Sequence, residues 1–349
     1  MHTRQNELNK WLATLFSHKP FTLTPLAGDA SFRRYFRLHC GELTHVVMDA
    51  PPDKEAIAPF ISIGNQLATA GVHTPAILAV NHTEGFILLE DLGDQLLLDA
   101  LSRDSADMLY TAAMTTLLQI QQCPTSHSKL PEFDLTHIFQ ELSLFREWFL
   151  HAYLNIELNA HDELLLQDTF DWLTTQITAQ PQVFIHRDYH ARNLMMINKN
   201  NLQGSSNCVD QNAHIVTAEN IGVIDFQDAM RGPFTYDLVS LLKDCYIQWP
   251  REHVIRWLTY FYHKLPSTHG WSLMEFTRAF DLCGLQRHLK VLGIFCRLHL
   301  RDHKAAYLRD LPLTLHYVNA CSESYAELQP FYHFIQKKVY LPFTEKNPS

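Results

Sequence analysis

Five polar residues have the types and the spacing that phosphoryl transfer requires. The pattern H-R-D-x-x-x-x-N is formed by His186, Arg187, Asp188 and Asn193. Asp225 stands near the end of the next apolar run. In this chemistry a carboxylate faces the attacking hydroxyl group, and hard oxygen ligands hold Mg²⁺ against the triphosphate. We therefore predict that Asp188 orients the acceptor hydroxyl and takes its proton, and that Asn193 and Asp225 bind Mg²⁺.

Short apolar runs of strand-like composition must position these residues. Residues 183–185 precede the pattern, residues 194–197 follow it, and the run 221–226 contains Asp225. A loop between two strands can turn back so that the Asn193 amide oxygen and a carboxylate from the next strand end reach one metal ion. His, Asp and Asn are also ordinary loop residues, but their offset together with the flanking strands favours the catalytic interpretation.

The composition is that of a globular protein without a nucleic-acid or membrane partner. The chain has 349 residues, enough for about two domains, and its formal net charge is −9 with no long basic run. No apolar stretch approaches the ~20 residues of a membrane span, and the N-terminal residues lack the apolar core of a secretion signal. Seven cysteines without a C-x-x-C pair favour reduced thiols. These features predict a cytoplasmic protein.

The first ninety residues show mainly strand periodicity. We predict an amphipathic helix at 6–16, a second helix that ends near residue 70 before Gly71, and strands at 21–26, 34–38, 44–48, 76–80 and 85–90.

Two segments of this region are candidates for nucleotide binding. The turn 27–33 can place backbone N–H groups and a serine hydroxyl over phosphates, and its glycine allows close approach. A plain hairpin turn is the alternative interpretation. The polar crossing 90–94 is where the hinge of a two-lobed kinase would bind adenine through main-chain groups. The candidate residues are Gly28, Ser31, Arg33, Glu90 and Leu92.

Helical periodicity dominates the remainder, with predicted helices at 106–121, 141–151, 163–178, 238–247 and 285–300. The fold class is therefore predicted to be α+β. It comprises a small antiparallel N-lobe at 1–90, a hinge at 91–95 and a mainly α-helical C-lobe at 96–349. The polar stretch 198–220 is predicted to be a surface hairpin insertion. Asp237 is predicted to cap the helix that follows it.

Further charged residues could contact a substrate. The helix 285–300 and its end carry four cations that fall within roughly an 80° sector at 100° per residue. This stripe could face an anionic part of a substrate, or it could be a solvated helix face. Asp228 could bind Mg²⁺ indirectly or a substrate hydroxyl, or it could be a solvated loop acid. The stripe consists of Arg287, Lys290, Arg297 and Arg301.

The motifs at 28–37, 186–193 and 224–226 resemble the aminoglycoside phosphotransferase and choline kinase family. The resemblance extends over about residues 23–325, and it implies the two-lobed protein-kinase-like fold. It also implies ATP as co-substrate and Mg²⁺ as metal ion.

The motifs at 48–52, 85–94, 186–193, 225–229 and 284–290 are more narrowly similar to the bacterial N-acetylmuramate/N-acetylglucosamine kinases of peptidoglycan recycling. This similarity implies phosphorylation of the anomeric hydroxyl of an amino sugar, so the expected partners are a small sugar and a nucleotide. The lactyl carboxylate of N-acetylmuramate could pair with the basic stripe or with Arg192.

One departure from the wider family concerns the third strand. The family fold supplies a lysine there to the ATP phosphates, whereas this chain has Met48 or Asp49. Main-chain amides could replace the lysine, and so could one of four cations: Lys54, Arg33, Arg34 and Arg37.

Glu55, near the start of the second helix, could orient a cation or be a solvated acid of the first turn. Two alternative functions therefore stay open: a kinase for another small hydroxyl acceptor, such as an aminoglycoside or a choline-like alcohol, and a catalytically silent nucleotide-binding module.

Overall fold

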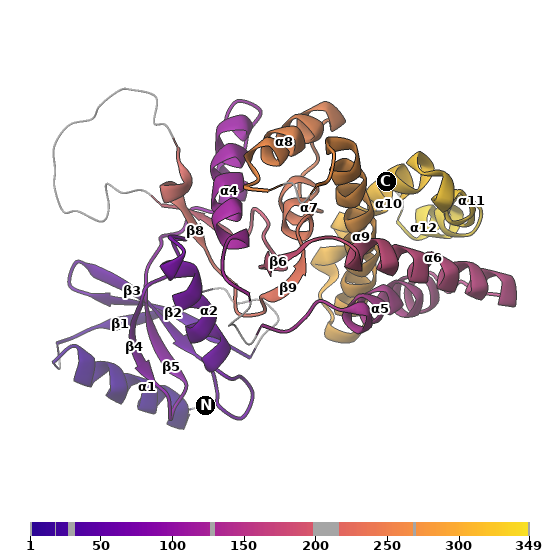
Figure 1. The fold of residues 1–349 in the computed structure, drawn as a ribbon. Helices are drawn as coiled ribbons and strands as arrows, with labels where there is room; N and C mark the ends of the chain where they lie inside the picture. Colours follow the sequence, from indigo (N-terminus) through magenta and orange to yellow (C-terminus); the bar gives the residue numbers. More distant parts are fainter. Residues whose placement is uncertain are drawn as a thin grey trace. The chain divides into compact units, whose positions relative to one another are not determined.

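The computed structural model describes residues 2–17, 19–26, 32–125, 130–197, 216–267 and 270–347. Contacts divide the chain into two compact units (Figure 1). The first unit comprises Met1–Cys123 and Ala191–Asp228, and the second comprises Pro124–His190 and Ala229–Ser349. These units differ from the predicted lobes, because residues 96–123 and 191–228 belong to the first unit rather than to a continuous C-terminal region.

A five-stranded antiparallel sheet forms the centre of the first unit (Figure 1). Its order is β1-β2-β3-β5-β4, and each predicted strand is confirmed within one or two residues. Side chains alternate between the two faces of a strand, and this period of two is the pattern that identified these segments. The strands are β1 (Thr22–Leu26), β2 (Arg34–Cys40), β3 (Leu43–Asp49), β4 (Ile77–Asn81) and β5 (Phe86–Glu90).

Helix α1 (His2–Leu15) covers one face of this sheet. Its Leu8 and Leu12 are fully buried against Leu38, Val47 and Phe86. Helix α2 (Ala58–Thr69) ends before Gly71, whose φ of +80° is the left-handed conformation that glycine adopts without strain. The predicted helix end near Gly71 is thus confirmed.

The first unit also contains a small two-stranded sheet and two helices, α3 (Leu97–Ala100) and α4 (Ala106–Gln121). Strand β7 (Leu194–Met196) pairs antiparallel with β8 (Ile221–Val223). A short 3-10 helix, Ala218–Asn220, leads into β8. The predicted hairpin insertion at 198–220 lies largely outside the described residues, which resume at 216.

The second unit is mainly helical. Its two strands, β6 (Gln182–Ile185) and β9 (Met230–Pro233), pair antiparallel. Helix α5 continues into a π-helical segment, Phe145–Tyr153, and shorter 3-10 or π-helical segments occur at Ala305–Asp310, Ala326–Leu328 and Ile335–Val339. The α-helices are α5 (Leu135–Leu144), α6 (Ala160–Thr178), α7 (Tyr236–Leu242), α8 (Arg251–Lys264), α9 (Leu273–Asp302), α10 (Leu311–Ser324), α11 (Gln329–Phe334) and α12 (Tyr340–Lys346).

Helix α9 is longer than the predicted segment 285–300, because its N-terminus is fixed by a capping box. The Ser272 hydroxyl accepts from the Glu275 amide, and the Glu275 carboxylate accepts from the Ser272 amide at 2.7 Å. No helix within the described ranges is long and apolar enough to cross a membrane. The six cysteines within those ranges are buried free thiols.

Candidate active site

Asp237 holds the start of the catalytic loop where β6 ends. Its fully buried carboxylate accepts hydrogen bonds from the His186 amide at 2.6 Å and the Arg187 amide at 2.9 Å. Burial raises the pKa of Asp237 to about 6, although the two amides and His186 oppose the shift. The prediction that Asp237 caps α7 is therefore wrong: Thr235 is the N-cap residue, and Asp237 lies inside the first turn.

Arg187 is held in an uncommon backbone conformation by contacts on all sides. Its φ is +77°, in the left-handed region. Its side chain donates to Glu141 at 2.7 Å, and its carbonyl oxygen accepts from Arg287 at 2.8 Å. Glu141 also contacts Lys290 at 2.9 Å. Burial raises the pKa of Glu141, but the charges of Lys290 and Arg187 lower it further, below its ordinary value.

Asp188 follows Arg187 and is the predicted base. Its side chain is 44% exposed, and one oxygen lies 3.4 Å from Nη2 of Arg287. Desolvation raises the pKa of this carboxyl group, but the positive charges of Lys290 and Arg287 outweigh it and hold the pKa well below the usual range. Asp188 is therefore ionised at neutral pH, which suits a group that orients a hydroxyl by accepting its hydrogen bond.

The predicted basic stripe is divided by the structure. Arg287 and Lys290 are each only 7% exposed, and both approach the Tyr236 hydroxyl, at 3.5 and 3.2 Å. Arg301 lies about 21 Å from Arg287 along α9, at 1.5 Å per residue, and it pairs with Asp302 at 2.8 Å. Arg297 is half-buried near Arg301. The four cations therefore do not share one environment: Arg287 and Lys290 are buried, whereas Arg301 is exposed at the end of the helix.

The two predicted metal ligands lie together in the first unit. Asp225 is exposed, has a φ of +63°, and one of its oxygens lies 3.4 Å from Nδ2 of Asn193. Gln227 donates to the other Asp225 oxygen and to Asp228, each at 3.0 Å. Rotating the Asn193 amide by 180° exchanges its nitrogen and oxygen, so the pair can present two hard oxygen donors to a divalent cation.

No cluster of three or more His, Cys, Asp or Glu side chains that could hold a metal occurs in the described parts of the chain. Mg²⁺ is bound by one or two carboxylates together with substrate phosphates. The Asn193–Asp225 pair fits that requirement.

The candidate nucleotide residues differ in what surrounds them. Gly28 and Ser31 lie outside the described residues. The Glu90 carboxylate contacts His73 at 3.1 Å and accepts from the Ala76 amide at 3.1 Å. Leu92 is half-buried and packs against Gly222. Since the Glu90 and Leu92 side chains are engaged within the unit, main-chain groups are what this segment can offer an adenine.

Arg33 contacts Glu55 at 3.7 Å. Helix α2 begins at Ala58, so Glu55 precedes this helix and is not an acid of its first turn. Arg192, in the first unit, is half-buried.

Sequence reasoning missed several residues that support Asp188. Glu141 and Tyr236 carry no motif, because each falls in an apolar helical pattern. Asp244, after α7, is also buried: one carboxylate oxygen has no hydrogen-bond partner among the residues that the structure describes. Burial raises the pKa of Asp244 to about 7, against the charge of Arg287. Only tertiary contacts identify these residues.

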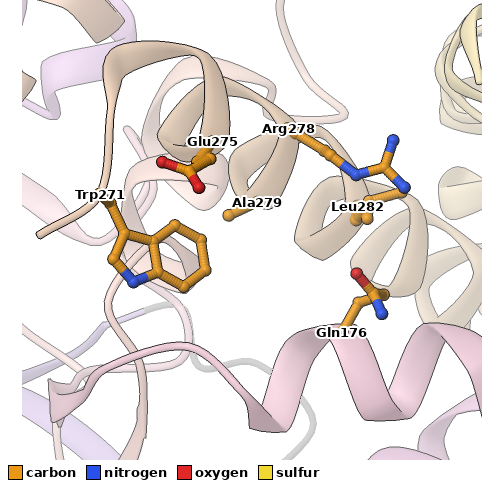
Figure 2. A pocket seen from close by; sticks show the side chains of 6 residues that line it. All are labelled: Gln176, Trp271, Glu275, Arg278, Ala279 and Leu282. Carbon is orange, nitrogen blue, oxygen red and sulfur yellow. The ribbon is translucent and has the colours of Figure 1, made fainter.

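A separate pocket of about 220 Å³ lies in the second unit (Figure 2). Two of its polar side chains already have structural partners, since Glu275 caps α9 and Arg278 donates to Glu327 at 2.8 Å. It contains none of the predicted site residues. It is lined by Gln176, Trp271, Glu275, Arg278, Ala279 and Leu282.

Comparisons with known proteins find relatives that match almost the whole chain. The N-acetylmuramate/N-acetylglucosamine kinase of Neisseria meningitidis serogroup B is 38% identical over 346 residues, 96% of each chain. The protein of the same name from Pseudomonas aeruginosa is 38% identical over 93% of this chain and 94% of its own.

Solved structures confirm the predicted α+β, protein-kinase-like fold. An ethanolamine kinase from Plasmodium vivax aligns with a TM-score of 0.59 at 11% identity, over 89% of this chain and 85% of its own. The aminoglycoside phosphotransferase APH(2'')-Ib in its ADP-bound form aligns with a TM-score of 0.58 at 15% identity, over 89% of this chain and 97% of its own. The model of the phosphotransferase enzyme family matches residues 22–204 and 209–273. The chain thus belongs to the phosphotransferase enzyme family and is an ATP-dependent kinase.

Proposed function

We propose that this kinase transfers the γ-phosphate of ATP to the anomeric hydroxyl of N-acetylmuramate or N-acetylglucosamine. The observation that carries the proposal is the ionised Asp188 on a buried, positively charged support, within a chain that matches two sugar kinases over almost its full length. The reaction needs ATP, so we place it in the cytoplasm.

Asp188 acts by orientation more than by basicity. Its carboxylate accepts a hydrogen bond from the anomeric hydroxyl and directs the oxygen lone pair at the γ-phosphorus. The new bond joins the sugar oxygen to phosphorus, the bond to the β,γ-bridging oxygen breaks, and ADP leaves. The proton of the hydroxyl passes to Asp188. A hemiacetal hydroxyl is more acidic than an ordinary alcohol, so a weakly basic carboxylate is sufficient.

Asn193 and Asp225 are the residues that would hold Mg²⁺, since both offer hard oxygen donors on one side of the first unit. When bound, the ion neutralises charge on the phosphate oxygens. Gln227 contacts both Asp225 and Asp228 and can keep the two carboxylates apart. Asp228 is therefore proposed as an indirect contact, to metal-bound water or to a substrate hydroxyl.

Recognition of the acceptor is proposed to use Arg192. Arg287 and Lys290 are nearly buried and contact Asp188 and Glu141, so their charges support the base rather than a substrate carboxylate. Arg192 remains as the cation proposed to pair with the lactyl carboxylate of N-acetylmuramate.

ADP release tests the proposal. With Mg-ATP, the purified protein should release ADP when either amino sugar is added. Asp188→Asn should lower kcat by ~10²-fold or more, because the amide cannot take the proton. Asp168→Asn, an exposed acid on α6, is the matched control and should leave kcat unchanged.

Other acceptors decide between the alternative functions. Turnover of an aminoglycoside or a choline-like alcohol, but of neither amino sugar, would refute the proposed acceptor and keep the chemistry. Thermal stabilisation by Mg-ATP without turnover of any acceptor would instead support a silent nucleotide-binding module.

A further inference from the structure

Strand β3 lacks the cation that kinases of this fold direct at the ATP phosphates. In protein kinases a lysine on the third strand contacts the phosphates and pairs with a glutamate on a neighbouring helix. Here Met48 is fully buried. The buried Asp49 pairs with Arg34 of β2 and accepts from Nε of Arg4 on α1 at 2.7 Å. Another residue must supply the positive charge if ATP is bound.

The sheet register places Tyr35 on the same face as Met48. Tyr35 of β2 is directly opposite Met48 of β3, and residues directly opposite each other project from one face. Arg33 lies just before β2, and its side chain hydrogen-bonds to the Tyr35 hydroxyl. Val47, on the other face, packs beneath α1. Arg33 thus contacts the side of the sheet where the lysine would lie.

Glu55 completes the same type of ion pair. It lies 3.7 Å from Arg33, just before α2, and the Arg33 side chain is only 12% exposed. A shielded cation beside a carboxylate is held in a narrower range of positions than an exposed one. The pair repeats the cation–glutamate arrangement of kinases with an arginine that directly precedes β2.

Helix α2 also connects this pair to the metal side of the site. Phe60 of α2 packs against Phe226 with ring centroids 4.8 Å apart, and Phe226 directly follows Asp225. The environment of Tyr35 also indicates that Arg33 and Asp225 lie near each other. Burial raises its pKa to about 12, the charge of Arg33 opposes this, and the negative charge of Asp225 adds to it. Arg33 and Asp225 therefore act on the same hydroxyl group.

The other three cations predicted as substitutes are engaged elsewhere. Arg34 pairs with Asp49, and Arg37 contacts Asp91 at 2.8 Å and Asp94 at 2.7 Å. Lys54 is 53% exposed and lies 3.9 Å from its neighbour Asp53. Of these four cations, Arg33 is the one that, among the described contacts, shares a neighbour, Tyr35, with Asp225.

We propose that Arg33 binds the ATP phosphates in place of the third-strand lysine and that Glu55 is the residue that positions its guanidinium group. A guanidinium donates to two phosphate oxygens at once, which a lysine cannot do in the same geometry. The inference rests on the proposed ATP-dependent transfer but not on the identity of the sugar.

Direct binding of nucleotides, measured by calorimetry without any sugar, tests this assignment. Arg33→Ala should weaken ADP and ATP by about 10- to 100-fold, the effect of losing hydrogen bonds to a charged group, and should leave adenosine binding unchanged. Arg33→Lys should recover part of the loss. Lys54→Ala removes a nearby exposed cation as a matched control and should change neither affinity.

Glu55→Gln distinguishes positioning from support of the fold. If Glu55 positions Arg33, the variant should raise KM for ATP several-fold, keep kcat, and reduce ADP affinity relative to adenosine. Equal weakening of ADP and adenosine would show a structural role and overturn the assignment, as would unchanged ADP affinity in Arg33→Ala.

Arg33→Met retains the aliphatic stem and serves if Arg33→Ala does not fold. Because no acceptor is present, a wrong sugar leaves this result intact. A wild-type chain that binds neither ADP nor ATP would overturn both proposals.

Discussion

The unusual backbone conformation of Arg187 determines which way the next residue, Asp188, points. Its left-handed backbone is retained because its amide, side chain and carbonyl are each bonded to a different partner: Asp237, Glu141 and Arg287. Uncommon conformations persist where several contacts determine them together, and they concentrate at functional sites. The position of the Asp188 carboxylate is therefore set by residues that do not touch the substrate.

Asp237→Asn should separate activity from stability. The amide has one acceptor oxygen for two backbone N–H groups, so the loop should lose one charge-assisted hydrogen bond and kcat should fall by about 10-fold or more. Thermal stability should change little, because removing the buried charge, whose burial costs free energy, offsets the lost hydrogen bond. Steady-state kinetics and thermal unfolding measure the two effects. A large loss of stability with normal kcat would contradict this role.

The motif residues could be proposed from the sequence, but the residues that contact them could not. Asp188, Asn193 and Asp225 stand at offsets that the chemistry itself requires. Asp237 was assigned to the wrong partner because an acid before an apolar helix is also typical of a cap, and its true partners lie about 50 residues earlier. Glu141 has no local signal, since its function depends on Lys290 of a distant helix.

At Gly293, helix α9 lies so close to the end of α5 that no side chain fits between them. A Cβ on Gly293 would lie 2.7 Å from Cβ of Leu144 and still closer to the Leu144 carbonyl group, where α5 becomes π-helical. Backbone atoms cannot move aside as a flexible side chain can. The glycine therefore fixes how near α9 lies to this junction.

Gly293→Ala should lower the free energy of unfolding by about 1–3 kcal/mol, the usual effect of overpacking. Gly284→Ala is the matched control on the same helix, because the nearest atom to its Cβ would be Val239 Cγ1 at an ordinary 3.5 Å. It should instead gain up to ~1 kcal/mol from helix propensity. Urea denaturation measures both. Equal effects of the two substitutions would refute the close approach.

Elements were predictable where their period is local. Helix α4 and the five sheet strands follow from apolar spacing, whereas α9 begins twelve residues before the predicted segment 285–300, where the capping box at Ser272 sets its start. The π-helical turn after α5 leaves no pattern that spacing can reveal. Periodicity also could not show that Arg287 and Lys290 are buried whereas Arg301 is exposed.

The division of the chain into two units is likewise a feature that local sequence periodicity does not reveal. Asp188 belongs to the second unit, whereas Asn193 and Asp225 belong to the first, although one motif contains Asp188 and Asn193. Long-range backbone bonds draw the later segment into the first unit, from Met196 to Gln95 and from Val223 to His73, each at 2.8 Å. Pairing between distant segments leaves no periodic signal in a sequence.

Global stability should respond to pH through Asp244. Its pKa is raised from the ordinary value of about 4 to about 7 on folding, so the folded chain binds more protons between these values. The stabilising contribution of the neutral group is complete below pH 4 and is lost as the pH rises through 7. This carboxyl group therefore costs stability at neutral pH.

Asp244→Asn stays neutral at every pH. Its stability relative to the wild type should therefore increase between pH 4 and 7 and level off above, reaching on the order of 1 kcal/mol or more. Groups such as His288, whose pKa is lowered to about 3 by burial, titrate in both proteins and cancel in the difference. Denaturation at pH 4.5, 6 and 7.5 gives the curve. A difference that does not vary with pH would contradict the shift.

The cation surplus beneath Asp188 bears on how each catalytic cycle ends. If Asp188 takes the sugar's proton as proposed, Arg187, Arg287 and Lys290 then face one negative charge fewer. Their mutual repulsion favours loss of that proton to bulk water. The charges that keep the pKa of Asp188 low would thus also return the carboxyl group to its ionised form for the next cycle.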